Sequence, residues 1–163
     1  MKKGLLMLYT GSPTGAAAMA LGQAFRAVGR GFRICFIRFG GDPSAFERVF
    51  HSDPYREMVE FHQFDKKSID SEAVTTNAAG PTHAWELARK AIASGKFRMV
   101  VLEGIIDLLK SNSLDEGSVE VFLSARPADL HVIATGLDAP KSLIDAADLV
   151  TEVLETDQHR ANG

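Results

Sequence analysis

The sequence of 163 residues contains one cysteine, Cys35, and one tryptophan, Trp85. A single cysteine excludes an internal disulfide and a metal site built from several cysteines. No apolar run approaches the ~20 residues of a membrane-spanning helix, and no leader-like segment follows Met1. With 18 basic and 21 acidic residues, the net charge of −3 gives no electrostatic reason to expect nucleic acid or a membrane as partner. We therefore expect a cytoplasmic protein without either partner.

The composition is otherwise that of an ordinary globular protein. Hydrophobic residues make up 45% and charged residues 24% of the chain. The length fits a single domain over residues 1–163. Cys35 lies within an apolar run, so we interpret it as a small buried hydrophobe. The histidines show no metal-ligand spacing with one another; they are His51, His62, His83, His131 and His159.

Six short apolar runs, rich in β-branched and aliphatic residues, are predicted to be strands. Most are apolar at consecutive positions, which is typical of strands buried on both faces of a parallel sheet. Helical patterns lie between them. This alternation predicts an α/β fold, a three-layer sandwich with a mainly parallel sheet. The strands are expected at residues 5–9, 32–39, 59–64, 97–102, 130–135 and 149–154, and the helices at 15–28, 71–94, 114–125 and 140–146.

The least regular stretch, residues 40–57, follows the second predicted strand. In a parallel sheet it lies near the carboxyl ends of the strands, where ligands bind. A functional lid and a plain surface loop are both consistent with this stretch. Its aromatic residues Phe46, Phe50 and Tyr55 either cover a flat ligand or anchor the loop.

Residues 8–18 read Leu-Tyr-Thr-Gly-Ser-Pro-Thr-Gly-Ala-Ala-Ala and connect the first strand to the first helix. A strand, a glycine-containing turn and a helix in this order are the setting of a Walker A loop. A working loop ends in Gly-Lys-Ser/Thr, where the lysine reaches the phosphates and the hydroxyl holds magnesium. Here Gly15 is followed by Ala16 and Ala17. The sequence has the setting of a phosphate-binding loop and lacks both functional side chains.

Further blocks along the chain carry a resemblance to a known family. They are Ala-Trp-Glu-Leu-Ala-Arg-Lys-Ala at 84–91, Ser-Ala-Arg-Pro at 124–127, His-Val-Ile-Ala-Thr-Gly at 131–136 and Leu-Ile-Asp-Ala-Ala-Asp-Leu-Val-Thr-Glu at 143–152. With Tyr-Thr-Gly at 9–11, they resemble the P-loop-type ATP:corrinoid adenosyltransferases, which act on cob(I)alamin or cob(I)yrinic acid a,c-diamide. The resemblance covers residues 5–159. It implies a RecA-like P-loop NTPase fold, ATP and Mg²⁺ at the first loop, a corrinoid substrate and a homodimer.

In that family the reduced cobalt attacks the ribose 5′ carbon of ATP and triphosphate leaves. The protein must therefore neutralise and position a triphosphate. The family loop reads Thr-Gly-x-Gly-Lys-Gly-Lys-Thr-Thr. Aligned without gaps, its second glycine falls on Pro13 and its first lysine on Thr14, while its phosphate lysine falls on Ala16 and its threonines on Ala17 and Ala18. Pro13 also removes a backbone N–H from the phosphate cradle.

Other positions implied by the resemblance also differ. The basic residue after the second strand is replaced by Gly41, although Arg38 stands close by. The Asp-Glu pair that ends the Val-Val-Leu strand becomes Glu103-Gly104, so that one carboxylate is lost. The arginine that usually follows Thr-Gly is Leu137. These differences predict weak or no binding of ATP.

For several candidate residues, the sequence is consistent with both a ligand-binding and a structural role. The first loop either binds phosphate through its amides and the helix N-terminus alone, or only connects strand to helix. Glu103 either holds Mg²⁺ weakly or orients a ligand, or it caps the next helix or faces solvent. We interpret Arg126-Pro127 as a structural link between helix and strand. The loop candidates are Thr10, Gly11, Ser12, Thr14, Gly15, Ala16 and Ala17, and the other ligand-edge candidates are Arg38, Gly41, Glu103, Thr135 and Gly136.

Two functions follow from these observations. The chain is either an adenosyltransferase with altered phosphate contacts, or a non-catalytic homologue that binds a corrinoid, another ligand or a protein partner. In both cases we expect residues 10–15, 38–42, 103 and 135–138 to converge at the carboxyl edge of the sheet. The largest polar-lined pocket should touch the first loop and Glu103.

Overall fold

The computed structural model describes residues 3–40, 48–64 and 80–155. They form a six-stranded sheet in the order β3-β2-β4-β5-β1-β6, and every neighbouring pair is parallel. All six strands coincide with predicted apolar runs. The strands are β1 (Leu6–Gly11), β2 (Ile34–Phe39), β3 (Val59–Phe64), β4 (Met99–Glu103), β5 (His131–Gly136) and β6 (Leu149–Val153).

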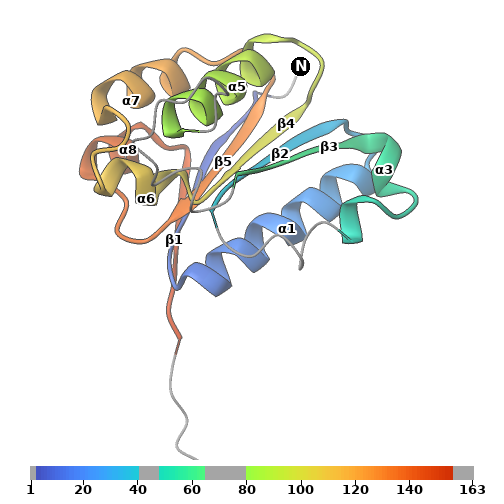
Figure 1. Ribbon diagram of the computed structural model, residues 1–163, viewed down its shortest axis with the longest axis horizontal. Helices are drawn as coiled ribbons and strands as arrows, with labels where there is room; N and C mark the ends of the chain where they lie inside the picture. Colours follow the sequence, from blue (N-terminus) through green and yellow to red (C-terminus); the bar gives the residue numbers. More distant parts are fainter. Residues whose placement is uncertain (1–2, 41–47, 65–79, 156–163) are drawn as a thin grey trace, which may run out of the picture.

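Helices cover both faces of the sheet, as Figure 1 shows. Helix α1 (Pro13–Gly29) and the short α3 (Tyr55–Met58) lie on one face. The other face carries α5 (Pro81–Ala93), α6 (Ile105–Lys110), α7 (Glu116–Ser124) and α8 (Lys141–Ala146). The predicted α/β three-layer sandwich is therefore confirmed, and it is consistent with a RecA-like fold.

Each face of the sheet has its own apolar layer, because side chains alternate along the strands. On β2, Ile34 and Phe36 belong to the layer under α1. Cys35 and Ile37, between and after them, belong to the layer under α5 to α8. All four are fully buried. Burial on both faces explains why the strands are apolar at consecutive positions.

Helix α1 packs closely on the sheet through small side chains. Ala16, Ala20, Ala24 and Ala27 are buried at intervals of three or four residues along one face of the helix. The helix begins at Pro13, with Ser12 as its N-cap, so the predicted start at residue 15 is too late by two residues. Proline fits this first turn because its missing N–H has no partner there in any helix.

The other helices differ from the predicted ones mainly at their ends. The predicted helix over 71–94 begins at Pro81, because Gly80 before it has an extended backbone; residues 71–79 lie outside the described residues. Neither α3 nor α6 was predicted: α3 has four residues and begins within the stretch expected to be irregular, and the six residues of α6, four of them apolar, are too few to show a helical period. The predictions for 114–125 and 140–146 correspond to α7 and α8.

The described part of the irregular stretch is anchored by aromatic packing. Phe50 is 1% exposed, and its ring centroid lies 5.0 Å from that of Phe36 and 5.1 Å from that of Phe61. Tyr55 packs against Phe25 of α1 at 4.9 Å. These contacts favour the anchoring role for Phe50 and Tyr55. Phe46, Gly41 and Asp42 lie outside the described residues.

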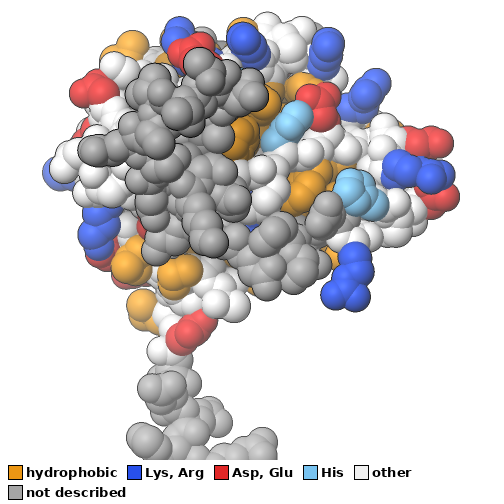
Figure 2. Space-filling model, in the orientation of Figure 1, with side chains coloured by type: hydrophobic (Ala, Val, Ile, Leu, Met, Phe, Trp, Pro, Cys, Tyr) orange, Lys and Arg blue, Asp and Glu red, His pale blue; other side chains and the backbone are white. Residues whose placement is uncertain are grey.

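The face of the molecule in Figure 2 has a mixed charge pattern. Basic and acidic side chains are interspersed there and do not form a patch of one sign. Among residues 3–40, 48–64 and 80–155, no helix is long and apolar enough to cross a membrane.

Candidate functional site

The junction between β1 and α1 is a tight turn, because only Ser12 separates the strand from the helix. Gly11 ends β1 with φ +96°, and the Ser12 amide donates to the carbonyl oxygen of Val153 on β6 at 2.8 Å. A Cβ on Gly11 would lie 2.3 Å from that same oxygen. The backbone at the start of α1 is therefore pressed against the end of the neighbouring strand.

Three of the amides at this helix start, those of Ser12, Gly15 and Ala16, are bonded within the chain. The Ser12 hydroxyl accepts from the Gly15 amide at 3.1 Å, and the Ala16 amide donates to the Ser12 carbonyl oxygen at 2.8 Å. The same hydroxyl donates to Oε1 of Glu155, just beyond β6. Pro13 has no N–H to offer. A carboxylate of the chain itself thus lies at the helix N-terminus, where the helix dipole favours negative charge.

A cavity of about 510 Å³ lies beside this junction, at the carboxyl edge of the sheet. It is larger than the cavities of about 310 and 290 Å³ at the amino edge of the sheet. The first turns of α1 and the ends of β2 and β4 meet around it, which brings together three of the segments expected to converge. Its lining is both polar and apolar, and consists of Pro13, Thr14, Ala17, Ala18, Leu21, Arg38, Phe39, Gly40, Glu103, Gly104 and Asp107.

Arg38 and Glu103 form an ion pair in the wall of this cavity. They are register partners on β2 and β4, and Arg38 Nε lies 2.7 Å from Glu103 Oε2. Their side chains are 12% and 13% exposed. Burial raises the pKa of the Glu103 carboxyl, and the nearby Asp107 adds to the rise, while the Arg38 guanidinium opposes it. Glu103 therefore neither caps the next helix nor faces open solvent, the two structural alternatives that the sequence suggested.

The remaining candidates at this edge hold loops together. Thr135 is 2% exposed, and its hydroxyl accepts from the Gly104 amide at 3.0 Å. A Cβ on Gly136 would lie 2.6 Å from the Cβ of Ile106, so the loop after β5 is packed against α6. The Thr10 hydroxyl accepts from the Ala139 amide at 3.2 Å. None of the three residues lines the cavity; their hydrogen bonds and packing hold the loops next to it in place.

Two carboxylates at this edge did not emerge from the sequence. Asp107 lines the cavity and accepts from the Leu137 amide at 2.9 Å, which ties α6 to the loop after β5. Glu155 reaches the start of α1 because β6 pairs with β1. The position of Glu155 follows from this pairing, which can be inferred only when the order of the strands in the sheet is known.

The residues at the start of α1 do not fit a magnesium–triphosphate complex. A Walker loop offers free amides, a lysine and a hydroxyl that holds the metal. Here the Ser12, Gly15 and Ala16 amides have partners, the hydroxyl of Ser12 donates to a carboxylate, and alanines stand at the lysine and threonine positions. Glu103, the remaining carboxylate candidate for Mg²⁺, is paired with Arg38.

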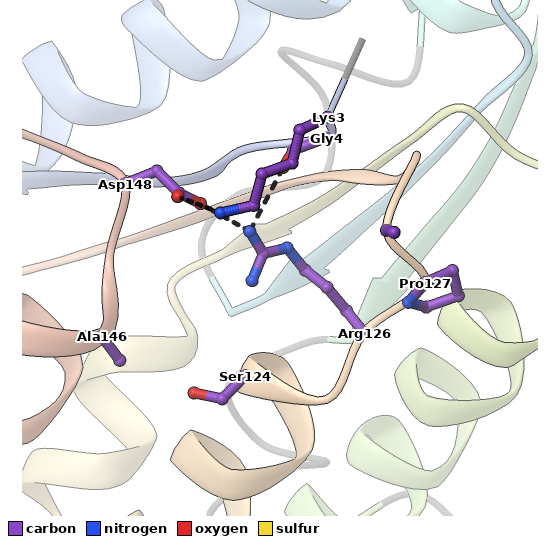
Figure 3. Close-up of a pocket in the computed structure, with 8 residues that line it drawn as sticks. Lys3, Gly4, Ser124, Arg126, Pro127, Ala146 and Asp148 are labelled. Atoms are coloured by element: carbon purple, nitrogen blue, oxygen red, sulfur yellow. Dashed lines mark hydrogen bonds and ion pairs between the residues drawn. The ribbon is translucent and has the colours of Figure 1, made fainter. Parts of the chain in front are cut away.

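The opposite edge of the sheet carries a separate polar network (Figure 3). Arg126, 8% exposed at its side chain, donates to Asp148 and to the Leu123 carbonyl oxygen at 3.1 Å. Asp148 also accepts from the Leu6 amide at 2.9 Å and from Lys3 Nζ at 3.0 Å. Arg126 therefore has a structural role, but it links the end of α7 to the starts of β1 and β6 rather than to the next strand, β5, as the sequence suggested.

Comparisons with known proteins agree with this architecture. The family model of the ATP:corrinoid adenosyltransferases BtuR/CobO/CobP matches residues 2–163. A corrinoid adenosyltransferase of Pseudomonas aeruginosa is 28% identical over 158 residues, covering 93% of this chain and 75% of that protein. One of Salmonella typhimurium is 27% identical, with 93% and 77% covered. An uncharacterized protein of Nostoc is 30% identical over 92% of this chain and 43% of its own length. The chain belongs to the ATP:corrinoid adenosyltransferase family.

Proposed function

We propose that this chain is a ligand-binding member of the family that binds Mg-ATP weakly or not at all. It does not catalyse adenosyl transfer from an ATP bound at the first loop, as the family does. The observation that carries the proposal is the start of α1. Three of its backbone amides are bonded within the chain, and the neighbouring charge is the Glu155 carboxylate. A triphosphate placed there would meet a like charge and no lysine.

The size of the expected loss follows from the missing contacts. A charge-assisted hydrogen bond contributes about 1.5–3 kcal/mol. Ala16 removes such a contact, that of the lysine with phosphate, and Ala17 removes the hydroxyl ligand of magnesium. We expect a dissociation constant for Mg-ATP in the high micromolar to millimolar range, about 10⁻⁴–10⁻³ M.

The cavity at the carboxyl edge is the proposed ligand site. Parallel α/β sheets bind ligands at this edge. Ala17, Ala18 and Leu21 provide an apolar wall, opposite the Arg38–Glu103 pair. A corrinoid is the proposed ligand, because the family acts on corrinoids. A single domain over residues 1–163, a cytoplasmic location and a homodimer belong to the same proposal.

A second candidate function is adenosyl transfer with altered phosphate contacts. The match of the family model to residues 2–163, rather than to a fragment, favours it. It requires that ATP displace Glu155 from Ser12 and that another cation take the place of the missing lysine. An assay of adenosyl transfer to chemically reduced cobalamin distinguishes the two functions.

The test is calorimetric titration of the full chain, first with Mg-ATP and then with hydroxocobalamin. We expect heat from the corrinoid and weak or no binding of Mg-ATP. The corrinoid adenosyltransferase of Pseudomonas aeruginosa is the reference protein under the same conditions. A low-micromolar dissociation constant for Mg-ATP contradicts the proposal and restores the transferase.

Corrinoid binding has its own matched variants. Leu21→Asp places a charge in the apolar wall of the cavity and should weaken the corrinoid signal. Val121→Asp, on an exposed position of α7 away from the cavity, is the control. Equal effects of the two substitutions would place the ligand elsewhere.

A further inference from the structure

A cluster of three potential metal ligands lies on the sheet face opposite the cavity. Cys35 on β2 is paired in register with Glu60 on β3, and Ile37 with His62. Because side chains alternate along strands, Cys35, Glu60 and His62 all point to the side of the sheet that α5 covers. Arg38 and Glu103 point to the α1 side, where they line the cavity.

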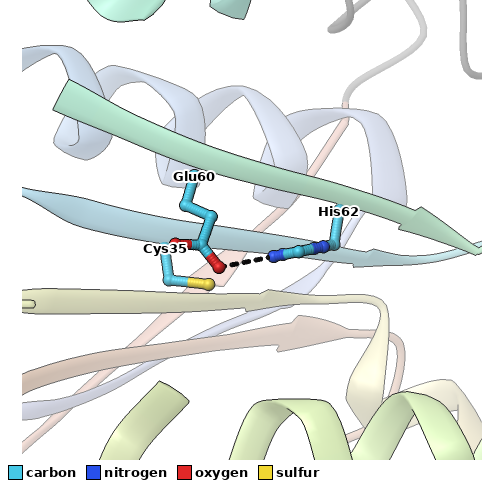
Figure 4. A group of neighbouring side chains, drawn as sticks. All are labelled: Cys35, Glu60 and His62. Atoms are coloured by element: carbon cyan, nitrogen blue, oxygen red, sulfur yellow. Dashed lines mark hydrogen bonds and ion pairs between the residues drawn. The ribbon is translucent and has the colours of Figure 1, made fainter. Parts of the chain in front are cut away.

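The donor atoms of the cluster are close together. The Cys35 sulfur, a Glu60 carboxylate oxygen and a His62 ring nitrogen all lie within 4.8 Å of one another. Glu60 Oε1 lies 2.9 Å from His62 Nε2. Figure 4 shows the thiol and the imidazole ring on either side of the carboxylate. Tetrahedral zinc at ~2.0–2.3 Å from its ligands needs them ~3.3–3.6 Å apart. Changes of up to about 1.5 Å in these separations, within reach of side-chain rotation, would meet that spacing.

The burial of the three residues gives the cluster an inner and an outer side. Cys35 is fully buried, whereas the side chains of Glu60 and His62 are 51% and 29% exposed. Because β3 is the edge strand of the sheet, solvent reaches the cluster from that side. An ion entering there meets the carboxylate and imidazole first and the thiol last. The exposed side leaves room for a water as fourth ligand, as in open zinc sites.

The electrostatics of the thiol are also informative. Burial and the neighbouring Glu60 charge raise the pKa of the Cys35 thiol to about 12, so the thiol is protonated at neutral pH. A divalent cation between the two groups would offset the charge of Glu60 and favour the thiolate. Lys90 and Lys96, which with Glu60 line a small neighbouring cavity, act against a cation and lower its affinity.

We propose that Cys35, Glu60 and His62 form a binding site for a zinc-type transition-metal ion between β2 and β3. One sulfur, one nitrogen and one carboxylate oxygen are the donor set that suits Zn²⁺ rather than Mg²⁺ or Ca²⁺. Binding converts the Cys35 thiol to a metal-bound thiolate and releases its proton to the buffer. The site is independent of the cavity and of the function proposed for it.

The test is titration of the reduced, chelator-treated full chain with Co²⁺ and Zn²⁺. With Co²⁺ we expect one equivalent to produce visible d–d bands of a four-coordinate ion and a near-ultraviolet sulfur-to-cobalt band. Zn²⁺ should displace the cobalt and abolish both, with release of a proton on binding of either metal. Absence of the sulfur-to-cobalt band in the wild-type chain overturns the proposal.

Three variants and a control locate the site. Cys35→Ser should abolish the sulfur-to-cobalt band. His62→Gln and Glu60→Gln should each weaken Zn²⁺ binding more than about tenfold; both side chains are partly exposed, so these variants keep the test valid if Cys35→Ser fails to fold. His51→Gln, at an exposed histidine outside the cluster, should leave the affinity unchanged. Equal losses in His51→Gln and His62→Gln would show non-specific binding and overturn the assignment.

Discussion

The two ends of β1, at opposite edges of the sheet, differ in the charged groups that lie beside them. At the amino edge, Arg126 and Asp148 bond to each other and to backbone groups of two segments, the end of α7 and the start of β1. At the carboxyl edge, the turn before α1 has no cationic side chain of its own, and a carboxylate, Glu155, bonds to its N-cap. The sequence blocks that carry the family resemblance contribute residues to both edges. The amino end carries residues that hold strands in place, and the carboxyl end carries alanines at the positions where a Walker loop has its lysine and hydroxyl.

The proposed function treats these two groups of residues separately. Arg126 and Asp148, from the Arg-Pro and Ala-Asp-Leu-Val blocks, position β1 and β6 in this protein. Gly15-Ala16-Ala17 stands where a Walker loop has Gly-Lys-Ser/Thr, and α1 is well formed there, with Ala16 fully buried. Under our proposal, the chain matches the family over residues 2–163 while its first loop binds Mg-ATP weakly or not at all.

The largest expected effect comes from breaking the amino edge. Arg126→Ala removes an ion pair whose side chains are 8% and 23% exposed, and leaves the Leu123 carbonyl oxygen without this donor. We expect a loss of about 2–4 kcal/mol in the free energy of unfolding, measured by urea denaturation. Lys3→Ala removes the other partner of Asp148, but Lys3 is 73% exposed, so its loss should cost less than about 0.5 kcal/mol. Equal costs would show that Arg126 does not position the strands.

At the carboxyl edge, the backbone of the turn is the part most sensitive to substitution. Gly11→Ala places a Cβ 2.3 Å from the Val153 carbonyl oxygen at a residue with φ +96°. We expect destabilisation of at least about 2 kcal/mol in urea denaturation. Gly22→Ala, in the middle of α1 with open space around its Cβ position, is the matched control. It should stabilise the protein by about 0.5–1 kcal/mol. Tolerance of Gly11→Ala would mean that the turn is looser than the structure shows.

Restoring the lost side chains tests whether the rest of the carboxyl edge is still suited to nucleotide. Pro13→Gly, Ala16→Lys and Ala17→Thr together return a backbone amide, a cation and a magnesium ligand. Binding of Mg-ATP should tighten more than tenfold, or about 1.4 kcal/mol, by calorimetry. Adding Glu155→Gln should tighten it further, because the like charge at the N-cap is removed. An unchanged affinity in the quadruple variant would show that the edge differs at other positions, such as Gly104 or Leu137.

The smallest effect concerns the pH dependence of the amino edge. The Leu6 amide, followed by Lys3 and Arg126, holds the pKa of the Asp148 carboxyl below its ordinary value of 3.8. A lowered pKa in the folded state stabilises the protein above the ordinary value, and this contribution is lost as pH falls through the lowered pKa. Asp148→Asn should therefore flatten the decline of unfolding free energy in acid, measured by denaturation between about pH 5 and pH 2. Identical acid slopes in variant and wild type would assign the pH dependence to other carboxyls.

Much of the fold was predictable from the sequence because most strands are buried on both faces. Consecutive apolar residues marked the central strands, whereas the edge strand β3 alternates apolar and polar residues and the edge strand β6 is largely exposed. Helix α6 was not predicted, because six mostly apolar residues show no helical period. The start of α1 was placed at Gly15 because residues 11–15 were interpreted as a loop. In the structure Ser12 caps a helix that already includes Pro13.

The candidate site was predictable only in outline. That the ends of β1, β2 and β4 meet follows from any parallel α/β sheet. The individual contacts depend on strand order and register, which the sequence does not show directly. Arg38 meets Glu103 because β2 lies beside β4, and Glu155 meets Ser12 because β6 lies beside β1. The Cys35, Glu60 and His62 cluster depends in the same way on the register of β2 with β3.

The position of Glu155 makes the start of α1 a site of intramolecular competition. Its carboxylate is tethered two residues beyond the end of β6, so its local concentration at Ser12 is set by the chain and does not fall on dilution. Short tethers give effective concentrations in the millimolar range. A free anion with a single contact must exceed that concentration to displace it. A ligand that makes several contacts at once, or salt that screens the helix dipole, displaces Glu155 from Ser12 more readily.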